Sequence, residues 1–483
     1  MSIGRNTAVN LAGQIFPVLV SLLIVPRYLH VIGEARYGVL LMVWMFLGYF
    51  GLFDLGLGRA VAQRVAELRN DLTGGRNRVV WTALFLAGAL SVVGGMALYL
   101  AGNHGLAQCF GADASLRVEF LAALPWMALV LPANLMGGTL SGALQGREQF
   151  VKMNLIQNVA VLWSQLVPMA VATWWSVDLR WLVPAALSSR VVTGIWMFIV
   201  CRKQIPMTRI PVFDRSLVRS LFSFGSWVTV SSIASPILTS VDRFVIGIMN
   251  GAAAVTHYGV PLGIVSRASI LPSALASASF PRYAEGDRSV RLKLLVQSTG
   301  TLAAVFTPVA LGMMFLIGPF LTHWVGPGLA AKGTLVGELL VIGVWVNGLA
   351  LLPHAYLQAN ARPRISAMFH LMEILPYLLV LWLGLKFWGV AGAALAGTLR
   401  LTGDAILHFW ATEDKGSSLA ELVAPCLMLL AGLAAVIILT PDNPWRWVVA
   451  CGLLAAAVLW GWSRIPEFWR QRALPLLLRR EIA

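Results

Sequence analysis

The sequence contains few charged residues. Asp, Glu, Lys and Arg make up only 12% of the 483 residues, whereas a soluble domain carries about a quarter. Hydrophobic residues make up 58%, and the mean hydropathy is +0.77. With so little charge the chain cannot cover a soluble surface of this size, and a soluble globular protein is excluded.

Cysteine is equally scarce. The four cysteines are scattered and form no CxxC pair, which excludes a disulfide framework and a cysteine-based zinc site. The seven histidines also lack metal-ligand spacing along the sequence, so no resident metal or other cofactor is expected. A small-residue cleavage site is missing after the N-terminal apolar segment, which is therefore predicted to be a retained helix.

What the sequence has instead is a long series of apolar blocks. A helix needs about 20 mainly apolar residues to cross the hydrocarbon core, and such blocks recur from Asn6 to Trp462. The predicted fold class is all-α, a polytopic membrane protein with about fourteen transmembrane helices. The predicted spans are 6–29, 36–63, 79–101, 116–145, 151–175, 180–201, 217–249, 255–284, 290–317, 331–359, 364–387, 389–411, 419–440 and 445–463.

Basic residues gather in alternate loops. One set includes Arg64 to Arg78, Arg202 to Arg215 and the C-terminal tail, while the opposite loops hold little positive charge. The positive-inside rule therefore predicts that both termini are cytoplasmic, which requires an even number of spans. The same distribution accounts for the net charge of +15, so nucleic acid is not an expected partner.

The longest predicted cytoplasmic connection, 202–216, divides the sequence into two lobes of six helices. The lobes are 1–201 and 217–411, and residues 412–483 add a helix pair and a basic tail. An internal repeat supports this division. Asn134, Ser141, Leu144 and Gln145 recur as Asn347, His354, Leu357 and Gln358 at a shift of 213, and Tyr37-Gly38-Val39 recurs as Tyr258-Gly259-Val260. Copies six helices apart share one orientation, which predicts parallel, pseudo-symmetric repeats.

Polar residues fall on single helix faces. Ser231, Ser235, Thr239 and Asp242 form one stripe on the seventh predicted helix, and a second stripe runs along the eighth. Such stripes either bond helices together or line a shared aqueous cavity. Because several stripes are spread over both lobes, the cavity is favoured.

Charged residues inside predicted spans point the same way. Arg267 lies about ten residues into the eighth predicted helix, where a charge costs at least about 2.5–3.5 kcal/mol. It is expected to contact a ligand or gate transport, the alternative being a structural ion pair. Arg400 and Asp404 have the spacing of a helical ion pair, and Gly138, Gly142 and Gly146 favour close helix contact.

The opening of the chain resembles the polysaccharide transporter family of the multidrug/oligosaccharidyl-lipid/polysaccharide exporter superfamily. The resemblance rests on Pro26-Arg27-Tyr28-Leu29, on Gly33 to Gly38, and on Asp54-Leu55-Gly56-Leu57-Gly58-Arg59 within the stretch 48–60. It extends to Leu144-Gln145-Gly146 and to Asp242-Arg243.

The resemblance implies a carrier, not an enzyme, that flips an undecaprenyl-pyrophosphate-linked oligosaccharide across the bacterial inner membrane by alternating access. It also implies membrane lipids as surroundings, a polysaccharide polymerase and glycosyltransferases as partners, and a monomer. Proton or sodium coupling would involve Asp54 and Asp242. The candidate translocation residues are Arg267, Arg59, Arg243, Ser231, Ser235, Thr239, Ser266, Ser269, Ser273, Asn134, Asn347, Gln145 and Gln358.

Other functions stay open at this point. A peptidoglycan-precursor (lipid II) flippase has the same fourteen-helix plan, whereas a multidrug/cation antiporter usually has twelve and favours acidic cavity residues. A polytopic polymerase or glycosyltransferase places catalytic residues on large or acidic outer loops, and the predicted outer loops here are short.

Overall fold

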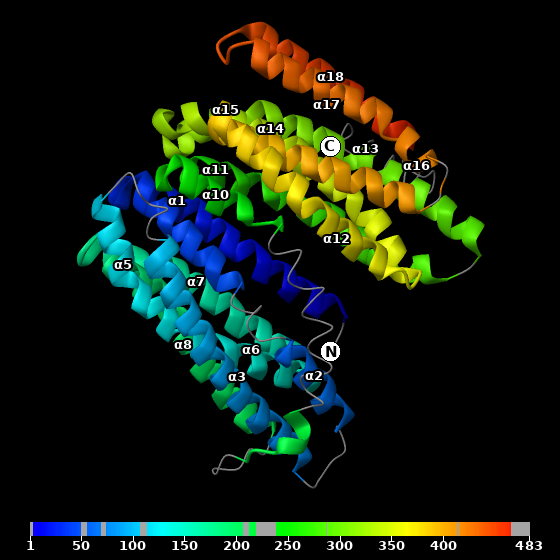
Figure 1. Cartoon of the computed structure of the whole chain (residues 1–483). Coiled ribbons are helices and arrows are strands. Elements are labelled where there is room, and N and C mark those ends of the chain that lie inside the picture. The colour runs from blue at the N-terminus through cyan, green and yellow to red at the C-terminus, as the bar shows by residue number, and fades with distance from the viewer. Residues whose placement is uncertain are drawn as a thin grey trace, which may run out of the picture. The chain divides into compact units, whose positions relative to one another are not determined.

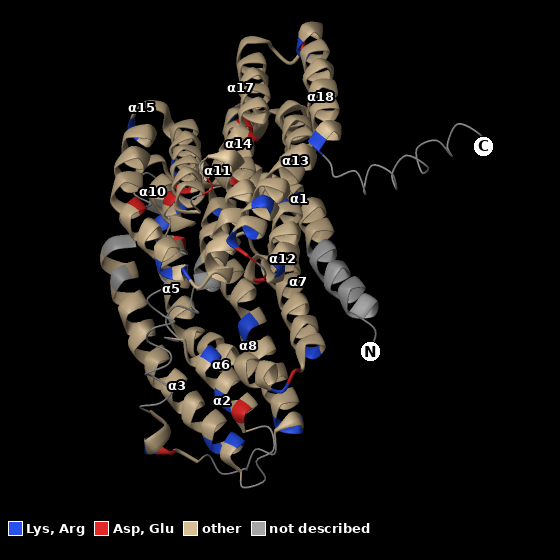
Figure 2. Cartoon of the chain, turned by 90° about the vertical axis from the view of Figure 1, so that its right-hand side faces the viewer, with Lys and Arg blue, Asp and Glu red and all other residues tan. Residues whose placement is uncertain are grey.

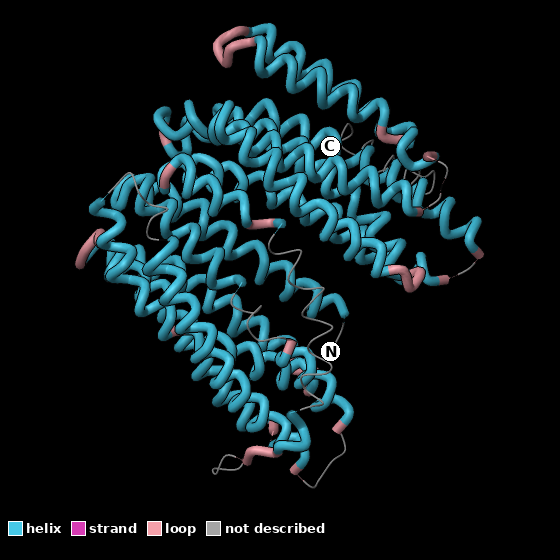
Figure 3. The backbone as a smooth tube through the Cα atoms, viewed as in Figure 1, coloured by secondary structure: helices cyan, strands magenta, loops and turns pink. Residues whose placement is uncertain are grey.

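The computed structural model describes residues 3–49, 56–68, 74–106, 114–205, 212–218, 238–285, 287–412, 414 and 416–464. Within these ranges the regular elements are helices and no strand occurs (Figure 3). Ten helices of the described part of the chain are long and apolar enough to cross a membrane. The predicted all-α polytopic class is confirmed, while the described residues do not establish the predicted count of fourteen.

Contacts divide the chain into two compact units, residues 1–256 and 257–483. The predicted linker 202–216 lies within the first unit, and the lobe boundary placed there stays a prediction. The helices of the first unit are α1 (Ile3–Tyr49), α2 (Leu57–Glu67), α3 (Gly75–Ala101), the π-helical η2 (Gly102–Leu106), α5 (Ala114–Leu129), α6 (Leu131–Gly146), α7 (Phe150–Trp174), α8 (Leu179–Gln204) and α10 (Val241–Asn250). Helix α11 (Ala252–Val265) crosses the boundary between the units.

Helix α6 is the centre of the first unit's packing. It contacts α2, α3 and α8, while α7 packs against α8 and α1 (Figure 1). Glycine makes the closest approach possible: a Cβ at Gly142 would overlap the backbone oxygen of Gly58 on α2. The predicted role of the glycine series in close helix contact is therefore confirmed at Gly142.

Helix α1 combines the first predicted span with the first half of the second. The two arms meet at Gly33, whose φ of 78° and ψ of 168° lie outside the helical region, a conformation that glycine adopts without a Cβ clash. Beside the kink, Arg36 donates to Glu119 on α5 at 2.5 Å. The second span was predicted to run unbroken to residue 63. In the structure its first part belongs to α1, which ends at Tyr49, and its last part belongs to α2, which begins at Leu57.

The second unit is built around α14. Its helices after α11 are η3 (Ser266–Ser269, a 3-10 turn), α12 (Ile270–Ala284), α13 (Arg288–Val325), α14 (Pro327–Ala359), α15 (Pro363–Ala411), α16 (Ser417–Ala420), α17 (Val423–Ile438) and α18 (Pro444–Arg464). Helix α14 packs against α12, α13 and α15, and α18 lies against α13 (Figure 1). Helix α15 bends at Gly389, where φ is 55°, so its arms correspond to the eleventh and twelfth predicted spans.

A buried ion pair joins α18 to α14. Arg446 and Glu338 are 2% and 3% exposed, and their charged groups lie 3.1 Å apart. Arg446 also donates to the backbone oxygens of Val436 and Leu439 at the end of α17. One guanidinium therefore holds both helices of the C-terminal hairpin to the unit.

The ends of α6 and α14 repeat each other in backbone detail. Among the described residues, only Glu148 (φ 58°) and Ala361 (φ 57°) are non-glycine residues with positive φ. Each follows its helix and closes it with the same pair of bonds. These bonds are Glu148 N–H to Gln145 O (2.8 Å) and Gln149 N–H to Leu144 O (2.9 Å), matched by Ala361 N–H to Gln358 O (3.1 Å) and Arg362 N–H to Leu357 O (2.9 Å). Every position shifts by 213, the shift of the sequence repeat, so the two helix ends share one local structure. The parallel arrangement of the lobes stays a prediction.

Charged side chains are sparse along the helices and more frequent at their ends (Figure 2). In the first unit, basic residues occur along α2, at the start of α3 and at the end of α8. Within the predicted linker, Asp214 accepts from Ser216, and this hydrogen bond lowers the pKa of the carboxyl. The backbone N–H of Asp214 donates to Thr82 on α3 at 3.0 Å, which fixes this part of the linker to the unit.

Candidate functional site

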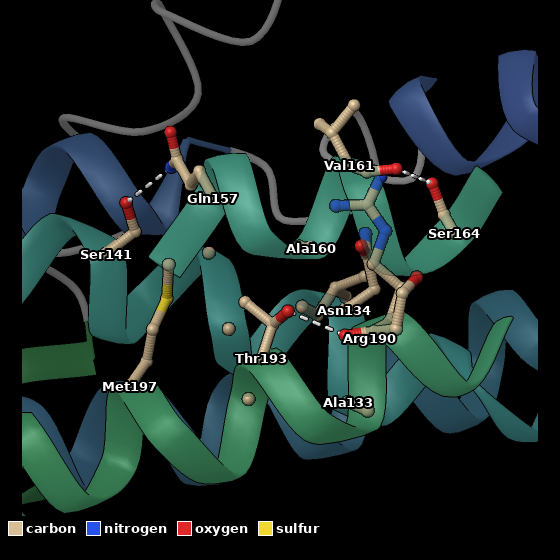
Figure 4. Close-up of a pocket in the computed structure, with 15 residues that line it drawn as sticks. Ala133, Asn134, Ser141, Gln157, Ala160, Val161, Ser164, Arg190, Thr193 and Met197 are labelled. Atoms are coloured by element: carbon tan, nitrogen blue, oxygen red, sulfur yellow. Dashed lines mark hydrogen bonds between the residues drawn. The ribbon is translucent and has the colours of Figure 1, made fainter. Parts of the chain in front are cut away.

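A pocket of about 430 Å³ opens between α6, α7 and α8 of the first unit. Its walls combine small residues with amide and hydroxyl groups (Figure 4). The polar lining residues are Asn134, Ser141, Gln157, Ser164, Ser189, Arg190 and Thr193. The volume is within the range of about 300–1,000 Å³ that small-ligand sites occupy.

Arg190 is the charged residue of this pocket. It lies near the middle of α8, and its side chain reaches in toward Asn134 and Val161 (Figure 4). Its Nε is shielded from solvent and has no hydrogen-bond partner among the described residues. Elsewhere, buried arginines such as Arg446 and Arg400 face a carboxylate. A guanidinium at this depth without an anion is energetically unfavourable, and an anionic ligand would relieve that cost.

The polar side chains around Arg190 make hydrogen bonds within their helices or to a neighbouring helix. Ser164 and Thr193 donate to backbone oxygens one turn earlier, at 2.8 and 2.6 Å. Gln157 donates weakly to Ser141 at 3.5 Å. Amide and hydroxyl groups so placed retain capacity for further hydrogen bonds, so the pocket can accommodate a ligand with both negative charge and hydroxyl groups.

Among the predicted site residues of the first unit, Asn134 lines this pocket. Gln145 lies exposed at the end of α6, and Arg59 is exposed on α2. Arg243 is 3.7 Å from the carboxylate of its neighbour Asp242 and donates to Thr239 O at 3.1 Å. Ser231, Ser235 and Asp54 lie outside the described residues.

In the second unit, Arg267 lies exposed in the 3-10 turn η3 and makes no hydrogen bond or ion pair with a described residue. Ser266 and Ser269 belong to the same turn, and Ser273 is exposed on α12. Asn347 and Gln358 lie on α14. The single cleft predicted to unite these residues with those of the first unit stays a prediction.

A second polar cluster joins α14 to both arms of α15. Gln358 donates to His354 at 2.8 Å, and His354 Nδ1 lies 3.4 Å from His408 Nε2. Asp404 Oδ1 is 3.1 Å from His408 Nδ1 and 3.7 Å from His370 Nε2. The donor atoms of His370, Asp404 and His408 lie within 4.8 Å of one another, a set able to hold a metal ion.

The predicted ion pair between Arg400 and Asp404, four residues apart, is wrong. Arg400 does not neutralise Asp404 one turn along the helix; it pairs with Glu373 on the other arm of α15 at 3.4 Å. The ring of Tyr377 lies 5.2 Å from the same guanidinium. The bend at Gly389 brings the two arms together, so the nearest opposite charge comes from across the bend.

Sequence reasoning missed Arg190 and the histidines. Arg190 was detectable, because it lies as deep inside its predicted span as Arg267 does in its own. The histidines were not, because His354, His370 and His408 have no metal-ligand spacing in sequence. The α14–α15 turn and the bend in α15 bring them together.

The long apolar helices define a multi-pass membrane protein, with a polar pocket between three of its helices. Residues 3–287, more than half of the chain, match the family model "Polysaccharide biosynthesis protein". The chain therefore belongs to that family, and the resemblance seen in the sequence is confirmed.

Two relatives match along most of their length. The "Putative O-antigen transporter" of Shigella flexneri is 27% identical over 416 residues, which cover 85% of this chain and 97% of that protein. The "Uncharacterized membrane protein EpsK" of Bacillus subtilis (strain 168) is 24% identical over 414 residues, covering 82% and 80%. Together with the family match, they confirm the expectation of a membrane protein of polysaccharide biosynthesis.

Solved structures share the fold at low sequence identity. The lipid II flippase MurJ, in an inward closed conformation, has a TM-score of 0.71 at 13% identity, covering 95% of this chain and 98% of that chain. An inward-facing multidrug resistance MATE family transporter has a TM-score of 0.63 at 13% identity, covering 86% and 99%. These likenesses concern the fold.

Proposed function

We propose that the protein flips an undecaprenyl-pyrophosphate-linked oligosaccharide from the cytoplasmic to the outer leaflet of the bacterial inner membrane. The observation that carries the proposal is Arg190, a guanidinium deep in a membrane-spanning helix with no carboxylate partner among the described residues. It lines a pocket rich in amides and hydroxyls. A pyrophosphate attached to a glycan supplies the complementary chemistry.

The fit is both electrostatic and geometric. A guanidinium binds phosphate oxygens through paired, charge-assisted hydrogen bonds, which are about twice as strong as neutral ones. In a desolvated site this gain offsets the cost of burying the arginine. Asn134 and Gln157 can exchange hydrogen bonds with sugar hydroxyls, while the polyprenyl tail stays in the bilayer.

Transport by alternating access needs further contacts along the path. Arg267 is the first candidate, since it is exposed and makes no ion pair with a described residue. Arg59 and Arg243 are further basic candidates, and the serines, Thr239, Asn347, Gln145 and Gln358 would bond the glycan. Asp54 and Asp242 are the candidates for proton or sodium coupling.

We further propose that both termini are cytoplasmic, as the loop charges predict. The protein would work as a monomer beside the glycosyltransferases and the polymerase of one polysaccharide pathway.

A lipid II flippase is the second candidate function, because the fold resembles that of MurJ and its substrate carries the same pyrophosphate. A cation extruder is disfavoured, because it would need an acidic pocket where Arg190 stands.

Export in cells tests the proposal. Deleting the gene should abolish the cell-surface polysaccharide and leave its lipid-linked repeat unit in the inner leaflet, and the wild-type gene should restore export. Arg190→Ala should fail to restore it at normal protein abundance. Arg180→Ala is the matched control, since Arg180 is an exposed arginine of the same helix that pairs with Asp178. Normal export by Arg190→Ala would contradict the assigned role, and an unchanged surface polysaccharide in the deletion strain would contradict the function.

A further inference from the structure

The histidines and acids of the second unit's polar cluster are not among the candidate translocation residues. Its three histidines and two acids come from α14 and both arms of α15, and lie near the turn between these helices. Asp404 and Glu373 have side chains only 10% exposed. Buried carboxylates are unfavourable unless they are paired or bind a cation.

One oxygen of each acid, Asp404 Oδ1 and Glu373 Oε1, is shielded from solvent and accepts no hydrogen bond of good geometry from a described residue. The two carboxyl groups also lie close enough to interact with each other. Arg400, the nearby fixed positive charge, faces the other oxygen of Glu373. The orphan Asp404 oxygen points to the ring nitrogens of His370 and His408, so the cluster has an acceptor-rich centre.

The spacing of these atoms suits a tetrahedral metal. Zinc binds nitrogen and carboxylate oxygen at about 2.0–2.2 Å, which places two ligands of one ion about 3.3 Å apart. Asp404 Oδ1 lies 3.1 Å from His408 Nδ1 and 3.7 Å from His370 Nε2. Binding would free His408 Nδ1 from its contact with the backbone oxygen of Asp404 at 2.9 Å, a carbonyl already inside the helix.

The neighbours of the three donors are arranged as supporting groups. His354 lies 3.4 Å from His408 Nε2, and Gln358 donates to His354. Ser366 lies 3.1 Å from the same His408 nitrogen. Partners of this kind orient ligating imidazoles.

We propose that His370, Asp404 and His408 form a binding site for a divalent transition-metal ion, of which zinc fits best. Two imidazoles and one carboxylate are borderline ligands that select zinc, cobalt or nickel over magnesium and calcium, which prefer oxygen. The bound ion would tie the two arms of α15 together beside α14. His370, with its side chain 24% exposed, is the most accessible of the three ligands.

The probe is cobalt(II) chloride added to the intact purified protein without a histidine tag. Tetrahedral cobalt with nitrogen and oxygen ligands gives a visible absorption band, which zinc should abolish by competition. We expect one equivalent of cobalt per chain, and a zinc-dependent rise in the thermal unfolding temperature that magnesium does not produce.

Variants assign the ligands. Asp404→Asn and His370→Ala should each weaken cobalt binding at least about 10-fold, by analogy with losses of 10–100-fold for supporting residues alone. His370→Ala removes the most exposed of the three ligands, so it keeps the test valid if Asp404→Asn unfolds. His323→Ala, which alters an exposed histidine near the end of α13, is the control and should bind normally.

No visible band with the wild-type protein, or an equal band with His370→Ala, would overturn the proposal. Export assays are a separate readout, so the metal site and the flippase function can fail independently.

Discussion

Arg446 and Arg190 show two ways in which a membrane-spanning helix can hold a guanidinium. Arg446 is surrounded by acceptors, with Glu338 and two backbone oxygens within 3.2 Å. Arg190 makes no ion pair with a described residue and lines a pocket. Arg446 therefore has its counter-charge within the protein, whereas Arg190 needs an anionic ligand to supply one. This contrast separates a structural arginine from a functional one.

Removing Arg446 should destabilise the protein. Arg446→Met leaves Glu338 buried without its partner, and breaking such a pair costs about 3–5 kcal/mol. Thermal unfolding in detergent should show a clear drop in the midpoint. The double variant Glu338→Gln with Arg446→Met should recover part of the loss, because no unpaired charge is left. Equal stability of Arg446→Met and wild type would contradict the structural role.

Arg190→Met should behave in the opposite way. The substitution removes a half-buried charge that makes no ion pair with a described residue, so the unfolding midpoint should stay the same or rise while export is lost. Such a trade of stability for activity is common at functional sites. Arg190→Lys should retain part of the export, because the charge survives but the paired hydrogen bonds do not. A fall in stability as large as that of Arg446→Met would indicate a structural arginine instead.

At the scale of helices, glycine decides how closely α2 and α6 approach. Gly142→Ala should lower stability, because its Cβ would overlap the backbone of Gly58, and overpacking typically costs about 1–3 kcal/mol. Gly137→Ala on the same helix is the control, since no atom lies within 4 Å of its Cβ position. It should match or exceed the wild-type midpoint. Equal midpoints for the two variants would show that α2 moves aside without cost.

Most helices could be predicted from the sequence, because a long apolar segment in a membrane satisfies its backbone hydrogen bonds by forming a helix. Breaks inside the runs were harder. The second predicted span is divided between α1 and α2, and η3 interrupts the eighth with a 3-10 turn. These features depend on single residues such as Gly33 and on local packing, to which hydropathy averaged over about 20 residues is insensitive.

The candidate site was predictable only in part. Asn134 was found because it repeats at Asn347, and Arg190 could have been found from its depth in α8. The grouping of His354, His370 and His408 requires the bend at Gly389. No spacing rule predicts contacts created by such a bend, because the residues involved lie on separate helix arms.

At the scale of the whole molecule, the charge bias predicts the orientation in the membrane. Reporter fusions within 202–215 and after Ala483 should both give cytoplasmic signals, because both segments are basic. A fusion at Asp178, in the turn between α7 and α8, should report the outer side. An outward signal at either basic segment would contradict the even number of spans.

The central claim is that Arg190 recognises the pyrophosphate of a lipid-linked glycan. The most direct measurement is flipping of a fluorescent undecaprenyl-pyrophosphate oligosaccharide in proteoliposomes containing the purified wild-type protein, Arg190→Ala or Arg180→Ala. The wild type and Arg180→Ala should flip this lipid, and Arg190→Ala should be at least about 100-fold slower, as loss of a charge-assisted contact of about 3 kcal/mol predicts. Equal rates for Arg190→Ala and the wild type would contradict the account.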